Sequence, residues 1–208
     1  SLPNIQVIPN PLPFTSEEVS DCTSKRVLAA GRYDFQKNFS LLLRIWSKIA
    51  PSYPDWKLEI IGDGALRPAL EEEVVQLGLS SSVELSRPTQ EMQAVYLHSS
   101  IYAMTSRYEG LPMVLIEAQQ MGLPIVSFAC PCGPRDVIHD GEDGFLIPMG
   151  KDDIFLKALT TLMASEEKRV CMGQRAREAS ARYEVDAVMN KWLTLFSELL
   201  PTKPTSGL

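Results

Sequence analysis

The composition of the stretch Ser106–Gly122, SRYEGLPMVLIEAQQMG, indicates a loop that leads directly into a helix. Pro112 suits the first helical position, where a backbone N–H would have no intrahelical partner. Gly122, followed by Leu123 and Pro124, is typical of a helix end. The residues between Pro112 and Gly122 are apolar around nearly the whole circumference, which predicts a buried helix.

Two carboxylates interrupt this apolar surface. Glu109 lies just before the helix, and Glu117 lies about 7 Å further along it. The free N–H groups of Gly110 and Leu111, together with the helix dipole, favour an anion such as a phosphate at the helix start. The spacing therefore predicts a ligand with a phosphate at one end and hydroxyl groups at the other. Alternatively, Glu109 caps the helix and Glu117 pairs with a neighbouring Arg or Lys.

The composition is that of an ordinary globular protein, with 208 residues of which 45% are hydrophobic and 22% charged. The net charge is −6 and there is no basic run, which argues against nucleic acid as a partner. We find no apolar run of membrane-spanning length and no signal-peptide pattern. Four cysteines do not make a disulfide framework, so we expect reduced thiols in a cytoplasmic protein.

Short apolar runs alternate with helical patterns along most of the chain. The runs span residues 27–30, 56–61, 83–85, 101–104, 125–128 and 144–147. This alternation predicts an α/β fold, a Rossmann-like parallel sheet with helices on both faces. From residue 152 to residue 200 the pattern is helical throughout. Asn38 is available to cap the helix that follows the first run.

The two ends of the chain differ from this pattern. Residues 1–24 are predicted to be a connector into the domain, with a short strand around Ile5–Ile8 before the prolines force an extended path. Residues 25–200 form the predicted domain. Residues 201–208 are predicted to be a disordered tail.

In an open parallel sheet, ligands bind outside the carboxyl ends of the strands. The predicted loops there are 31–37, 62–64, 86–89, 106–112 and 129–135. Lys37 precedes a helix start, where a cation is unfavourable unless an anion lies between it and the dipole. Together with Arg32 and the amides after Glu109, Lys37 could neutralise a diphosphate. The alternative is that Arg32 and Lys37 are both solvated surface residues.

Other candidate residues carry weaker signals. His98 and His139 are expected to be surface or packing residues. Arg135 either joins the anion site or pairs with Asp136 or Glu142. The sequence contains no nucleophile–histidine–acid arrangement, metal-ligand cluster, P-loop lysine motif or three-glycine dinucleotide fingerprint.

Several blocks of residues, taken in their order along the chain, resemble a known family. They are Ala30-Gly31-Arg32 with Gln36-Lys37, Ile61-Gly62-Asp63-Gly64, Ser106–Ala118, Gly122–Ser127, Pro131–Arg135, and Asp140-Gly141 with Gly144–Ile147. Together they are similar to the C-terminal domain of retaining glycosyltransferases of family 4, which have the GT-B fold. The similarity runs from about Ile5 to Leu200, and its most specific feature is the pair of glutamates with seven residues between them.

The resemblance implies a role for each matching residue. Arg32 and Lys37 would hold the diphosphate of a nucleotide-sugar donor, Glu109 would contact hydroxyl groups of the transferred sugar, and these three are the implied catalytic residues. Glu117 would bind the ribose. The other implied donor-binding residues are Gly31, the backbone of Gly110, Leu111 and Pro112, and Arg87 and Pro88 near the nucleobase. Such enzymes need no metal or other cofactor and leave the anomeric configuration unchanged.

Enzymes of this family have two domains with the active site between them, and this chain resembles only the second. We therefore expect the N-terminal acceptor domain to be absent, and the chain to bind donor without transferring sugar. The final helix, Val185–Leu200, would run toward the missing domain and leave Trp192 and Phe196 exposed. The resemblance also suggests polysaccharide assembly, with the full enzyme associating peripherally with the inner face of the membrane.

Two other functions are compatible with these residues. A sugar-nucleotide epimerase or a phosphorylase shares the fold, but a complete epimerase should offer more acid and base residues than we find. A non-catalytic α/β binding module would use the domain only as a partner surface. In that case Glu117→Ala and Arg32→Ala would leave ligand binding unchanged.

Overall fold

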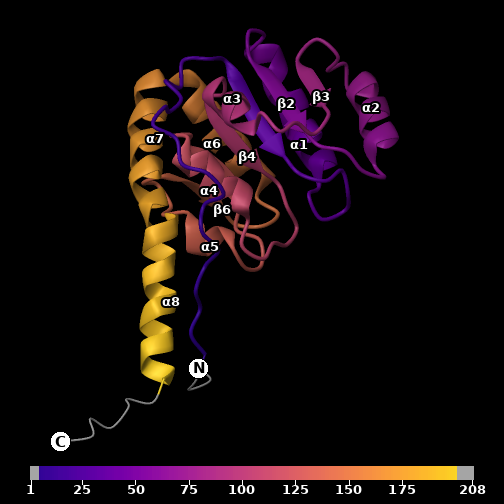
Figure 1. The fold of residues 1–208 in the computed structure, drawn as a ribbon. Helices are drawn as coiled ribbons and strands as arrows, with labels where there is room; N and C mark the ends of the chain where they lie inside the picture. The colour runs from indigo at the N-terminus through magenta and orange to yellow at the C-terminus, as the bar shows by residue number, and fades with distance from the viewer. Residues whose placement is uncertain (1–4, 201–208) are drawn as a thin grey trace, which may run out of the picture.

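The computed structural model describes residues 5–200, and its centre is a six-stranded sheet in which every neighbouring pair of strands is parallel (Figure 1). The strands are β1 (Arg26–Ala30), β2 (Lys57–Ile61), β3 (Val83–Ser86), β4 (Ile101–Met104), β5 (Ile125–Phe128) and β6 (Gly144–Ile147). Their order across the sheet is β3-β2-β1-β4-β5-β6. The predicted Rossmann-like parallel sheet is confirmed, and each of its six predicted strands, from 27–30 to 144–147, matches to within one residue at either end.

Helices connect the strands and cover both faces of the sheet. They are α1 (Phe39–Ile49), α2 (Arg67–Gln76), α3 (Met92–Leu97), α4 (Met113–Gln120), α5 (Pro134–Val137), α6 (Asp152–Ala164), α7 (Glu166–Ser180) and α8 (Val185–Leu199), with short 3-10 turns at Ala50–Ser52 and Ala181–Tyr183. Beyond β6 the described chain is helical, as the sequence predicted.

Two hydrophobic cores lie on the two faces of the sheet. In β1, Val27 and Ala29 pack in one core with α1, α2 and α6, whereas Leu28 and Ala30 pack in the other with α3 and α4. Successive side chains of a strand point to opposite faces, so a strand that is covered on both sides is apolar at most positions, with buried exceptions at Glu59 in β2 and Ser127 in β5. The uninterrupted apolar runs in the sequence have this cause.

The predicted strand around Ile5–Ile8 is wrong. Residues 5–25 contain no helix or strand, and Ile5 and Val7 are exposed. The segment is attached further along, where Leu12 is buried and its N–H donates to the Tyr183 carbonyl at 2.7 Å. An isolated apolar run forms a strand only when a partner strand lies beside it, and none does here within the described residues. The predicted tail, 201–208, lies outside the described residues.

The two predicted helix starts differ from the structure in their details. Helix α4 begins at Met113, so Pro112 occupies the cap position and not the first helical position. Asn38 occupies the cap position of α1, but it adopts a left-handed conformation with φ of 55° and makes no capping hydrogen bond. The predicted end of α4 is confirmed, because Gly122 has φ of 75° and its N–H donates to the Gln119 carbonyl.

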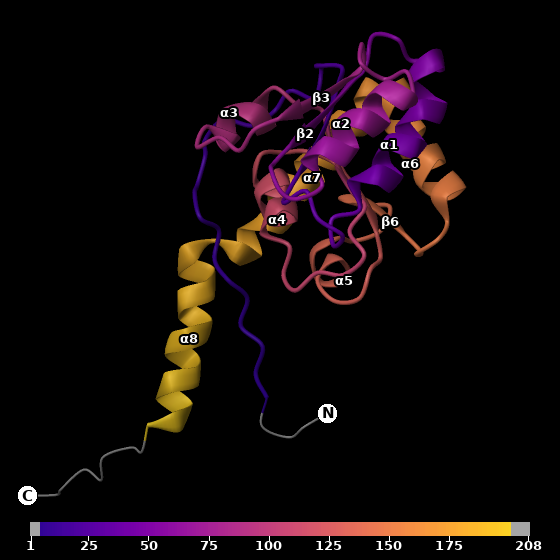
Figure 2. The same cartoon turned by 90° about the vertical axis from the view of Figure 1, so that its right-hand side faces the viewer.

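Helix α8 extends away from the sheet, as Figures 1 and 2 both show. Val188 is its one buried residue, while Trp192 and Phe196 are exposed, as predicted. The other exposed apolar residues of α8 are Val185, Met189, Leu193 and Leu199. Among residues 5–200, no helix is both long and apolar enough to cross a membrane.

Candidate donor-binding site

The order of the strands reverses between β1 and β4, and the loops that follow these two strands lie against each other. In an open parallel sheet a ligand-binding crevice forms at this point. The Arg107 N–H donates to the Gln36 carbonyl at 2.8 Å, and the Gln36 side-chain amide donates to the Tyr108 carbonyl at 3.0 Å. We call this region, formed by residues 31–37 and 106–112 together with Glu117, the β1–β4 crevice.

A buried ion pair joins the two loops. The Lys37 ammonium lies 2.7 Å from Glu109 Oε1, with 14% of the Lys37 side chain and 7% of the Glu109 side chain exposed. Gln36 Nε2 donates to the other oxygen of Glu109 at 3.3 Å. The alternative in which Glu109 caps α4 is wrong, because no side chain caps that helix. The anion that Lys37 requires near a helix start is therefore Glu109.

Arg107 supports the same loops from outside. Its guanidinium lies 4.2 Å from the centre of the Phe35 ring, and it donates to the Phe35 carbonyl at 3.1 Å and to Asn38 Oδ1 at 2.8 Å. The sequence analysis did not identify Gln36 or Arg107 as site residues. Each lies next to a predicted residue or inside the opening stretch, but only the tertiary structure pairs loops that are 72 positions apart.

Two glycines allow the loops to come this close. Gly31 has φ of 152°, and a Cβ there would lie 2.7 Å from Lys37 Cε, so the glycine makes room for the lysine stem. Gly133 has φ of 61°, and a Cβ there would lie 2.1 Å from the Gly110 carbonyl oxygen and 2.5 Å from Pro112 Cδ. The loop after β5 is thus packed against the start of α4.

The start of α4 offers unpaired backbone donors. The amides of Gly110 and Leu111 donate to no group in the described part of the chain. Space around Gly110 is open, since a Cβ there would meet no atom within 4 Å. Free N–H groups at the positive end of a helix attract an anion. The residues predicted to receive a phosphate are therefore accessible to one.

Glu117 lies on α4 at the edge of a cavity of about 240 Å³. The Tyr96 hydroxyl donates to Glu117 Oε2 at 2.8 Å, and no Arg or Lys of the described chain pairs with Glu117. Burial raises the pKa of the Glu117 carboxyl, and the hydrogen bond from Tyr96 opposes that rise. The predicted alternative, an ion pair with Arg or Lys, is wrong. The same cavity is lined by Gly31, Arg32, Gly62, Pro88, Met92 and Val114.

The other predicted cations, Arg32, Arg87 and Arg135, are more exposed than Lys37. Arg32 reaches the cavity, but 80% of its side chain is exposed and its Nε lies 3.5 Å from Asp34. Arg87 is also exposed and pairs with Asp63 at 2.8 Å. Arg135 is exposed, and it makes no ion pair with any described residue. Lys37 alone among these cations is fixed within the crevice.

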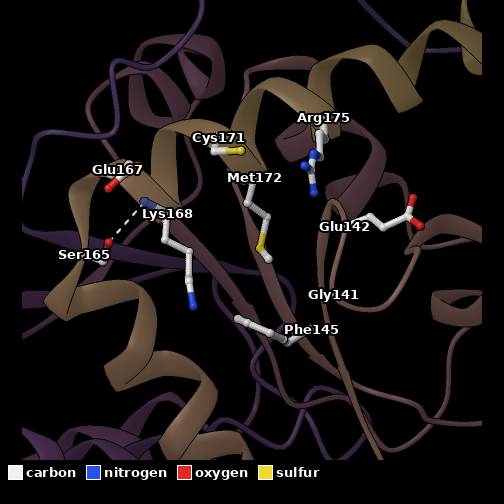
Figure 3. A pocket seen from close by; sticks show the side chains of 9 residues that line it. All are labelled: Gly141, Glu142, Phe145, Ser165, Glu167, Lys168, Cys171, Met172 and Arg175. Atoms are coloured by element: carbon white, nitrogen blue, oxygen red, sulfur yellow. Dashed lines mark hydrogen bonds between the residues drawn. The ribbon is translucent and has the colours of Figure 1, made fainter.

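A second hollow, of about 410 Å³, lies beside α7 and is lined by none of the predicted site residues (Figure 3). Met172 of α7 points toward Phe145 there, and the charged residues at its rim are Glu142, Glu167, Lys168 and Arg175. We call this hollow the α7 groove. It reaches Gly141 and Glu142 in the turn before β6, whereas the crevice lies at the carboxyl ends of the strands.

Known proteins resemble this chain in sequence. The family model described as "Glycosyl transferases group 1" matches residues 15–179. Amylovoran biosynthesis glycosyltransferase AmsD of Erwinia amylovora is 39% identical over 199 residues, covering 92% of this chain and 56% of AmsD. An alpha-1,4-N-acetyl-D-galactosaminyltransferase of Campylobacter jejuni, named for a PP-undecaprenol-linked saccharide, is 28% identical and covers 94% of this chain and 55% of that protein.

Solved structures share the same architecture. Staphylococcus aureus TarM, in a complex that contains UDP, superimposes with a TM-score of 0.84 at 25% identity, over 93% of this chain and 39% of TarM. The C-terminal domain of the group 1 protein LpcC from Francisella tularensis superimposes with a TM-score of 0.71 at 18% identity, over 84% of this chain and 97% of that domain. The chain thus spans about half the length of these curated relatives and nearly all of a solved C-terminal domain.

Proposed function

The chain belongs to the glycosyl transferases group 1 family, and from that premise we propose that it is the donor-binding half of a retaining glycosyltransferase. The donor would be a nucleoside diphosphate carrying a hexose-type sugar. The observation that supports this most directly is the buried Lys37–Glu109 pair, which lies beside the unpaired amides of Gly110 and Leu111. The charged side chains and the backbone N–H donors therefore lie together without a ligand.

In this proposal the diphosphate binds at the start of α4. The amides of Gly110 and Leu111 donate to its oxygens, and Lys37 donates to it while keeping its bond to Glu109, because an ammonium group has three donors. Arg32 is exposed and close enough to the cavity to turn toward the same group. These donors stabilise the negative charge that develops on the leaving diphosphate when the glycosidic bond breaks. We expect this chemistry to need no metal.

The carboxylates bind the two sugars of the donor. The second oxygen of Glu109 faces only the Gln36 amide among described groups, so it can accept a hydroxyl of the transferred sugar. Glu117, on the cavity wall, would accept the ribose hydroxyls. Arg87 and Pro88 lie in the loop after β3, on the side of the cavity where the nucleobase would lie.

The acceptor is proposed to be a saccharide or a lipid-linked acceptor, and the name of the Campylobacter jejuni relative contains a PP-undecaprenol-linked saccharide for that protein. Since this chain spans about half of each relative, we propose that acceptor binding and transfer require the remaining polypeptide. The exposed apolar residues of α8, including Trp192 and Phe196, would contact that polypeptide.

Calorimetric titration of the chain with UDP-, GDP- and ADP-sugars tests the proposal. We expect one of them to bind, and Lys37→Met to weaken binding at least about tenfold, since a charge-assisted contact is lost. Lys168→Met, which removes a lysine from the α7 groove, is the matched control and should leave affinity unchanged. Circular dichroism of both variants checks that they fold.

Two results would count against the proposal. One is the absence of heat with every donor in a folded sample. The other is equal weakening by Lys37→Met and Lys168→Met, which would place the binding outside the crevice. Unchanged binding in Lys37→Met would favour the simple binding module over an enzyme.

A further inference from the structure

Tyr96 is buried beneath the β1–β4 crevice and contacts the Glu117 carboxylate. None of the Tyr96 side chain is exposed, and its hydroxyl donates to Glu117 Oε2 at 2.8 Å. No other described side chain donates a hydrogen bond to Glu117. We propose that Tyr96 is a positioning residue that fixes the Glu117 carboxylate for the ribose hydroxyls of the donor, an inference that rests on the proposed function.

Helix α3 links the cavity wall to this hydrogen bond. Met92 lines the cavity, and Tyr96 follows it by four residues on the same face of the helix. The Tyr96 ring packs against the ring of Tyr102, with 6.2 Å between their centres. Because the Tyr96 ring is enclosed, its hydroxyl is held toward Glu117. The Glu117 carboxylate is thereby fixed relative to the cavity wall that the nucleoside would contact.

The groups around Glu117 explain why the hydrogen bond from Tyr96 is important. Arg32 and Asp63 line the same cavity, but neither bonds to Glu117, and Glu109 and Tyr102 are the other titratable groups nearby. Burial raises the pKa of Glu117, so without a donor the carboxyl would tend to take up a proton. Burial also raises the pKa of Tyr96 well above its usual value, so the phenol keeps its hydrogen and remains a donor.

The hydrogen bond leaves acceptor capacity for a ligand. An ionised carboxylate has about four lone-pair sites, and Tyr96 uses one of them on Oε2. Oε1 and the second lone pair of Oε2 remain for two adjacent hydroxyls such as those of ribose. Losing the phenol would free the carboxylate to rotate and to protonate, and a protonated carboxyl is a poorer acceptor.

The test compares two tyrosine variants. Tyr96→Phe removes the hydroxyl that holds Glu117. Tyr102→Phe removes an equally buried hydroxyl in the same aromatic pair. That hydroxyl accepts a hydrogen bond from the backbone N–H of Ala30 at 3.1 Å and makes no hydrogen bond to Glu117. Each variant and the wild-type chain are titrated with UDP, GDP and ADP and with their 2′-deoxy forms.

For the wild-type chain we expect the deoxy form to bind about tenfold more weakly than the ribose form. In Tyr96→Phe this difference in affinity should fall to about twofold or less, because the ribose form binds more weakly while the affinity for the deoxy form is little changed. Tyr102→Phe should keep the wild-type difference. In addition, ¹³C NMR of the glutamate carboxyls without ligand should show a higher pKa for Glu117 in Tyr96→Phe only.

The outcomes separate the two levels of the proposal. If the wild-type chain binds nucleotides and the two tyrosine variants keep the same ribose preference, the inference about Tyr96 is overturned and the proposed function stands. An unchanged Glu117 pKa in Tyr96→Phe also overturns it. If no nucleotide binds the folded wild-type chain, the proposed function fails, and the inference fails with it.

Discussion

The β1–β4 crevice and the α7 groove both contain cations and carboxylates, yet these charges are held in very different ways. In the crevice, Lys37 and Glu109 form a buried pair, and Glu117 is bonded to Tyr96. In the groove all four side chains are exposed, and they form no ion pair with any described residue: Glu142, Glu167, Lys168 and Arg175. The α7 groove therefore has the less organised charges.

This difference shows what distinguishes a prepared site from a surface depression. Exposed charges are solvated and mobile, and bringing them to a ligand costs side-chain entropy and desolvation. In the crevice, folding already orders and desolvates the charged groups, because two loops and two glycines fix them beside free amides. We therefore expect substitutions in the crevice to have larger effects than their counterparts in the groove.

The largest expected difference is between two glycine substitutions. Gly133→Ala would drive a Cβ into the Gly110 carbonyl oxygen, 2.1 Å away, and push the start of α4 out of place. We expect a loss of at least about 3 kcal/mol in the free energy of unfolding and no detectable nucleotide binding. Thermal or urea unfolding and donor titration measure the two effects.

Gly141→Ala in the α7 groove is the matched control for backbone strain. Gly141 also has a positive φ, of 81°, but a Cβ there would meet no atom within 4 Å. Gly141→Ala should lower the free energy of unfolding by about 1–2 kcal/mol through backbone strain alone and leave nucleotide binding intact. Equal losses of binding in both variants would mean that the contact between Gly133 and Gly110 does not organise the crevice.

A smaller effect is expected from neutralising one carboxylate in each hollow. The pKa of Glu117 is raised in the folded chain above its usual 4.5, so ionised Glu117 lowers stability at neutral pH. Glu117→Gln should therefore raise the free energy of unfolding by about 0.5–2 kcal/mol at pH 7 while weakening nucleotide binding. The gain should disappear as the pH falls below 4.5, where the wild-type carboxyl is protonated in both states.

Glu142→Gln supplies the comparison, since Glu142 is exposed and unpaired among the described residues. Urea unfolding at pH 7 and pH 4 should show no pH-dependent gain for this variant. A gain of the same size at Glu142, or none at Glu117, would show that burial does not distinguish the two carboxylates.

The sheet and the helices could be predicted from the sequence because their signals are local. Ile101–Met104 is apolar at every position and Ile125–Phe128 at every position but Ser127, and a strand covered on both faces is one of the few structures that favours such a run. Ile5–Ile8 is also mostly apolar but has no neighbouring strand within residues 5–200, and composition alone does not reveal that.

The site was predicted in part for the same reason. Glu109, Gly110 and Glu117 belong to one loop and helix, so their relation follows from helix geometry. The contacts of Lys37 with Glu109 and of Tyr96 with Glu117 join separate elements of the chain, and they depend on how those elements pack. The sequence predicted candidate donor-binding residues, but not which side chains hold them in place.

Amide NMR of the chain during a titration with UDP and with GDP and ADP tests the central claim most directly. If the crevice is the donor site, the resonances of Gly110 and Leu111 should shift most, because their free N–H groups receive the diphosphate, and the resonances of Lys168 and Arg175 should stay in place. Shifts concentrated at Lys168 and Arg175, with Gly110 and Leu111 unchanged, would contradict the claim.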